Sequence, residues 1–72
     1  MEAIINEILN LVKKKMQEQG GYDREAYKQY IEETIQYFQT KGKISEDDNT
    51  EFIEDRLMDL WPQVQESISR EY

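Results

Sequence analysis

The sequence has 72 residues, 16 of them acidic and 9 basic, so its formal net charge is −7 at pH 7. It contains no cysteine and no histidine, which excludes disulfides, thiolate chemistry, imidazole general bases and the usual zinc sites. The negative charge opposes direct binding to nucleic acid and to anionic membranes, and a chain this short forms at most one domain, residues 1–72.

No stretch approaches the ~20 apolar residues that cross a membrane. The N-terminus also lacks the basic stretch and continuous apolar core of a signal peptide. We therefore expect a cytoplasmic protein, and the initiating Met and polar C-terminal end suit a complete chain. One Trp, five Tyr and two Phe, together with periodic Ile and Leu, favour a packed fold over disorder.

The first predicted helix covers residues 2–19. Its apolar side chains span an arc of roughly 160° at about 100° per residue, wider than one neighbouring helix needs, so we expect it to pack against two others. Gly20 and Gly21 supply its stop, and the basic triplet at 13–15 is typical of a solvated helix end. The apolar set comprises Ile4, Ile5, Ile8, Leu9, Leu11, Val12 and Met16.

The second predicted helix covers residues 24–41. Asp23 is its expected N-cap, and Tyr22 is placed to pack on Tyr27 as a hydrophobic staple. Gly42 ends the helix, and the short link that follows makes the next helix a spatial neighbour. We expect its buried side to contain Ala26, Tyr27, Tyr30, Ile31, Thr34, Ile35, Tyr37 and Phe38.

The third predicted helix covers residues 46–70. Ser45 is its expected N-cap, with Asp48 three residues on in the position of a capping box. Pro62 lacks a backbone N–H, so the helix should be kinked or broken there, and the apolar phase slightly favours a kink. The apolar stripe contains Ile53, Leu57, Leu60, Trp61 and Val64.

Together these patterns predict an all-α fold, a small three-helix bundle whose third helix is kinked or broken at Pro62. No strand-like alternation and no internal repeat is present in the sequence. The predicted core contains Ile5, Leu9, Val12, Tyr27, Ile31, Ile35, Phe38, Ile53, Leu57, Leu60, Trp61 and Val64.

The third helix also carries an acidic stripe of Asp48, Glu51, Asp55 and Asp59. Carboxylates one turn apart repel by about 0.2–0.5 kcal/mol per pair, and Arg56 is the one obvious counter-charge within the stripe. One interpretation is a solvated face that keeps a small protein soluble. The sharper hypothesis is that the stripe docks a protein partner with a basic surface, with Trp61 as an apolar contact.

The docking hypothesis makes the protein a non-enzymatic adaptor or regulator, and two alternatives to it remain. The first is a structural module that self-associates as a homodimer, with Leu11 and Met58, which lie off the main apolar stripes, on the shared surface. The second is a nucleic-acid mimic whose carboxylates occupy a DNA- or RNA-binding protein.

Enzymatic activity is not expected, and no catalytic residue, cofactor or metal site is predicted. The segment from Asp47 does not fit a calcium loop, because the positions of the required glycine and glutamate hold Phe52 and Met58. A helix-turn-helix DNA reader is disfavoured because its recognition helix would bring carboxylates toward phosphates.

Overall fold

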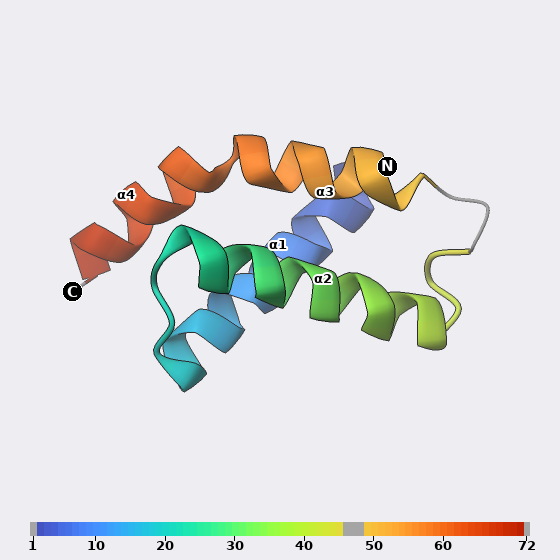
Figure 1. Cartoon of the computed structure of the whole chain (residues 1–72), viewed down its shortest axis with the longest axis horizontal. Helices are drawn as coiled ribbons and strands as arrows, with labels where there is room; N and C mark the ends of the chain where they lie inside the picture. The colour runs from blue at the N-terminus through green and yellow to red at the C-terminus, as the bar shows by residue number, and fades with distance from the viewer. Residues whose placement is uncertain (1, 46–48, 72) are drawn as a thin grey trace.

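The computed structural model describes residues 2–45 and 49–71, and these form four helices and no strand. They are α1 (Glu2–Gln19), α2 (Arg24–Thr40), α3 (Thr50–Asp59) and α4 (Trp61–Glu71) (Figure 1). The all-α prediction is therefore confirmed, whereas the count of three helices is one too few. No helix among the described residues has the length and apolarity needed to cross a membrane.

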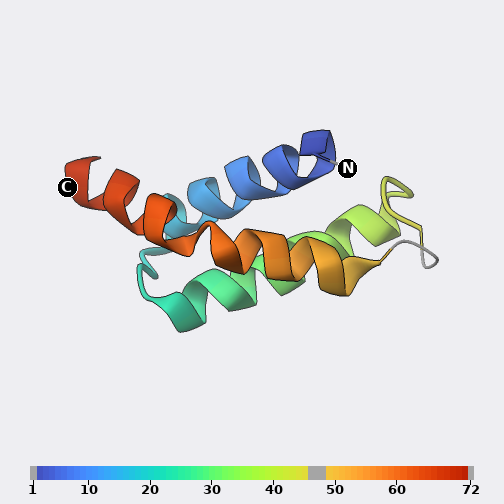
Figure 2. The same cartoon turned by 90° about the horizontal axis from the view of Figure 1, so that it is seen from above.

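The first two helices form an antiparallel hairpin, and α3 lies over α2 with α1 behind both (Figures 1 and 2). α1 therefore packs against two neighbours, as its wide apolar arc predicts. Gly20 ends α1 with a positive φ of 82°, and its N–H bonds to the carbonyl of Met16. Asp23 caps α2 by accepting from the N–H of Ala26 at 2.8 Å, as predicted.

The end of α2 turns the chain back into the core. Gly42 has a φ of 76° and donates to the carbonyl of Gln39, while the N–H of Lys43 bonds to the carbonyl of Phe38 at 2.9 Å. These two bonds form a Schellman motif. The next residue, Ile44, belongs to the link after α2 and is only 3% exposed, so the link itself contributes to the core.

The predicted start of the third helix is wrong by four residues. α3 begins at Thr50, and its N-cap is Asn49, whose side chain accepts from the N–H of Phe52 at 3.0 Å. Ser45 is exposed and outside a helix, so it does not cap α3, while residues 46–48 lie outside the described residues. Asn is at least as good an N-cap as Ser, so local chemistry permits either start.

The break in the C-terminal half lies at Leu60, two residues before Pro62. The N–H of Leu60 bonds to the carbonyl of Leu57 at 3.1 Å and closes α3, and the N–H of Val64 returns to the carbonyl of Leu60 at 3.0 Å. Pro62 thus falls in the first turn of α4, where its missing N–H removes no helical bond. The chain therefore forms two helices, and the kinked single helix that the apolar phase favoured is wrong.

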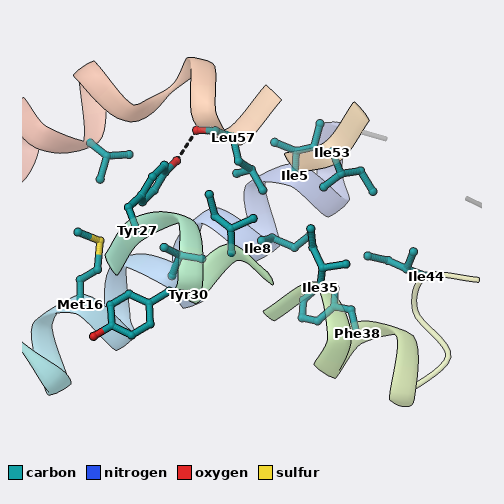
Figure 3. Packing of buried hydrophobic residues seen from close by; sticks show 13 residues of the cluster. Ile5, Ile8, Met16, Tyr27, Tyr30, Ile35, Phe38, Ile44, Ile53 and Leu57 are labelled. Carbon is teal, nitrogen blue, oxygen red and sulfur yellow. Dashed lines mark hydrogen bonds between the residues drawn. The ribbon is translucent and has the colours of Figure 1, made fainter. Parts of the chain in front are cut away.

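The core lies where the four helices face one another (Figure 3). Nine of the twelve predicted core residues are buried, and the other three, Leu9, Leu60 and Trp61, are partly buried against them. Tyr37 is 53% exposed, so its expected place on the buried side of α2 is wrong. Buried residues that the core prediction omitted are Ile8, Met16, Tyr30, Thr34 and Ile44.

A polar contact joins α2 to α3 close to the helix break. The hydroxyl of Tyr27 on α2 donates to the backbone carbonyl of Leu57 on α3, and both side chains are fully buried (Figure 3). The ring of Tyr27 also packs on Trp61, with 4.9 Å between ring centroids and 35° between planes. Burial raises the pKa of Tyr27 to about 12.

We expect Tyr27→Phe to lower the free energy of unfolding by about 1–2 kcal/mol, because the buried Leu57 carbonyl loses its side-chain donor. The pKa also predicts the behaviour in alkali. The stability that depends on the protonated Tyr27 hydroxyl is complete below pH 10.0, the ordinary pKa of tyrosine, and is lost as the pH rises toward 12. Tyr27→Phe should therefore lose less stability than the wild type over this pH range. Urea unfolding across pH measures both effects; an equal loss in Tyr37→Phe, an exposed tyrosine, would contradict the assignment.

The cap at Asn49 is tested separately. Asn49→Ala should destabilise the fold by about 1 kcal/mol, because the N–H of Phe52 loses its acceptor. Ser45→Ala should cost less than Asn49→Ala, because Ser45 lies outside α3. Thermal unfolding of the two variants side by side decides where α3 begins, and a larger loss in Ser45→Ala would restore the earlier start.

Candidate functional site

The acidic stripe forms an exposed face along α3. Glu51, Asp55 and Asp59 are all exposed, and the helical rotation of about 100° per residue places them within an arc of roughly 80°. Ile53 and Leu57 occupy the opposite side and are fully buried. Asp48, the fourth predicted member of the stripe, lies outside the described residues. We call Glu51, Asp55 and Asp59 the acidic face.

An exposed aromatic side chain, absent from the predicted site, lies beside this face. Phe52 is 46% exposed, although a phenylalanine usually prefers burial. It follows Glu51 and precedes Asp55 by three residues, so its ring borders the carboxylates. Its position off the stripe of Ile53 and Leu57 is the sequence signal that could have identified it.

Trp61 lies elsewhere. It is the first residue of α4, beyond the break, and it is partly buried against the core and stacked on Tyr27. This contact agrees with the place of Trp61 in the predicted core. Its role as a partner contact stays a prediction.

The inner edge of α3 brings two carboxylates together. Partial burial of Glu54, followed by repulsion from Glu32 on α2, raises the pKa of Glu54 above its usual value. A side-chain hydrogen bond with Glu32 and the charge of Asp55 act in the same direction, while the Lys28 ammonium opposes them. The junction of α2 and α3 is therefore electrostatically unfavourable when both carboxyls are ionised.

A second surface feature lies between α1 and α2. Two adjoining hollows of about 550 Å³ and 250 Å³ share Leu11 and Tyr37 in their walls. Lys15 lies at one end and Lys41 and Lys43 lie at the other. Leu11 is the residue that the sequence suggested for a self-association surface; Met58, its proposed companion, is on α3 and partly buried against the core. We call this feature the α1–α2 groove.

The described side chains include no group of three or more acidic side chains placed to hold a metal ion. The carboxyl of Glu54, whose pKa is raised, belongs to a packing contact between helices. What the surface does offer is charge and exposed apolar area, which are the means of macromolecular recognition.

Comparison with known proteins gave no family to draw on. No protein-family model, curated protein or solved structure matches the chain significantly.

Neutralising Glu54 should stabilise the protein at pH 7. A carboxyl whose pKa is raised in the folded state gives its full stability when protonated, below 4.5, and this stability is lost as the pH rises through the folded value. Glu54→Gln should therefore raise the midpoint of thermal unfolding at neutral pH, and its advantage should vanish below about pH 4.

The control is Glu33→Gln, which removes an exposed carboxylate from α2. It should leave the midpoint nearly unchanged at both pH values. A Glu54→Gln variant that unfolds at a lower temperature than the wild type at pH 7 would contradict the unfavourable pairing with Glu32.

Proposed function

We propose that this chain is a non-enzymatic, cytoplasmic protein-binding adaptor or regulator that docks a basic surface through α3. The observation that carries the proposal is the exposed Phe52 beside the three exposed carboxylates of the acidic face. Aromatic side chains often supply the apolar anchor of a protein interface, and surrounding charges select the partner and its orientation. The combination fits a partner that has a small apolar socket ringed by Lys or Arg.

Energetics also favour a binding role over a purely solvated surface. Glu51, Asp55 and Asp59 are successive neighbours at four-residue spacing, and each such like-charge pair costs the helix about 0.2–0.5 kcal/mol. An exposed phenylalanine on the same helix forgoes burial as well. A partner with positive charge around an apolar site would relieve both penalties.

Two other functions remain as candidates. A self-associating structural module is favoured by the α1–α2 groove, whose walls contain the exposed ring of Tyr37. A nucleic-acid mimic is a narrower form of the same proposal, in which the basic partner surface is one that normally binds phosphates.

The direct test compares the wild type with three variants as baits in affinity capture from a lysate at increasing salt. The acidic-face variant carries Glu51→Gln, Asp55→Asn and Asp59→Asn. The anchor variant carries Phe52→Ser, which should leave the fold intact because the ring is already 46% exposed. The charge-matched control carries Glu18→Gln, Glu25→Gln and Glu33→Gln on exposed positions of α1 and α2, so both triple variants have a formal charge of −7 + 3 = −4.

We expect wild type and the charge-matched control to retain the same basic proteins, and the acidic-face and anchor variants to lose them. Binding by the wild type should also fall steeply with ionic strength, because exposed ion pairs are screened. Equal recovery by all four baits would show that α3 is a solvated face and would refute the proposal. Loss of binding in the control variant to the same degree would show that net charge, and not the acidic face, is recognised.

A further inference from the structure

The α1–α2 groove concentrates positive charge in a protein whose net charge is negative. Four charged side chains line its two hollows, and three of them are lysines. Glu7 is the fourth and already lies 3.9 Å from the ammonium of Lys43. Lys15 and Lys41, at opposite ends, therefore supply the remaining positive charge. A ligand for this groove should carry negative charge at both of its ends.

The middle of the groove is apolar and partly open. Leu11 is partly buried, and Tyr37 exposes 53% of its surface. The ammonium of Lys41 lies 5.7 Å from the centroid of the Tyr37 ring, so charge and aromatic surface are presented together. The best ligand therefore combines carboxylates with an apolar side chain beside them.

We propose that the α1–α2 groove receives α3 of a second copy of this chain. This inference rests on the proposed function and identifies the basic surface that the acidic face docks. The groove extends from Glu7 to Lys15, eight residues or about 12 Å along α1. The acidic face extends from Glu51 to Asp59, again eight residues or about 12 Å, with Phe52 beside it. Length, charge and apolar content all match.

The placement of the two surfaces permits this contact in every copy at once. Glu32 of α2 faces Glu54 of α3, whereas Tyr37 lies five residues later, about 140° further around the α2 axis. The groove therefore opens away from α3, and a chain whose groove is filled still presents its own acidic face. Such a contact is heterologous and joins copies head to tail. A symmetric groove-to-groove dimer is disfavoured because it would bring lysines against lysines.

The test is sedimentation equilibrium over a concentration series at about 0.15 M salt, where the screening length of about 8 Å leaves contacting pairs effective and weakens repulsion between distant like charges. The groove variant carries Lys15→Glu and Lys41→Glu, and its charge-matched control carries Lys14→Glu and Arg24→Glu, both at exposed positions. We expect wild type and control to self-associate, and the groove and acidic-face variants each to associate at least about tenfold more weakly.

Mixing the two defective variants gives the decisive result. The groove variant keeps its acidic face and the acidic-face variant keeps its groove, so together they should form a 1:1 pair that cannot grow further. The inference is overturned if the wild type remains a monomer up to about 1 mM, or if the mixed groove and acidic-face variants form no pair.

These failures are distinguishable from failure of the proposed function. If the acidic-face variant still loses basic proteins from the lysate while the groove variant behaves as wild type in every assay, α3 docks another partner and only the second-copy inference is wrong. If the acidic-face variant behaves as wild type in both the capture and the sedimentation experiments, both proposals are wrong.

Discussion

The arrangement of this small protein depends on how one backbone carbonyl is satisfied at the break between α3 and α4. An unbroken helix would need an N–H at position 62 to bond the carbonyl of Met58, and Pro62 offers none, which favours a break at this point. At the break the carbonyl of Leu57 accepts from the N–H of Leu60 and from the hydroxyl of Tyr27. Because Tyr27 belongs to α2, this contact fixes α3 against the hairpin, and Trp61 packs on the same ring. The local interruption is thus tied to the tertiary packing.

Sequence periodicity identified most of this architecture because burial follows the 3.6-residue repeat. It predicted α1 to its residue bounds and nine buried core residues. It failed where the deciding factor was not periodic. Ile44 reaches the core through the Schellman turn after α2, a feature of backbone geometry, and Ser45 and Asn49 are both good caps, so propensity alone could not choose between them. Leu60 ends α3 because Pro62 acts on the preceding turn.

The two candidate surfaces also differ in how far the sequence predicts them. Exposure of Glu51, Asp55 and Asp59 follows from the burial of Ile53 and Leu57 on one short helix, so the sequence could predict it. The groove required knowledge of two helices at once. Leu11 on α1 and Tyr37 on α2 meet only through the antiparallel packing of the hairpin, which no single-helix pattern contains. The sequence places Tyr37 on the buried side because the apolar arc of α2 includes it. In the structure α1 and α3 cover only part of that arc, and Tyr37 stays exposed.

Both surfaces have a common physical origin in the small size of the chain. A domain of this length buries only roughly 60% of its unfolded surface. In a bundle this small, each helix keeps one side uncovered. Apolar side chains on those sides, such as Leu11, Tyr37 and Phe52, cannot all be buried within one copy. In solution the surrounding charges keep such residues from associating indiscriminately, since a contact must match charge as well as shape. The charges of the acidic face and of the lysine-bordered groove therefore restrict which partners can contact the apolar side chains that the fold leaves exposed.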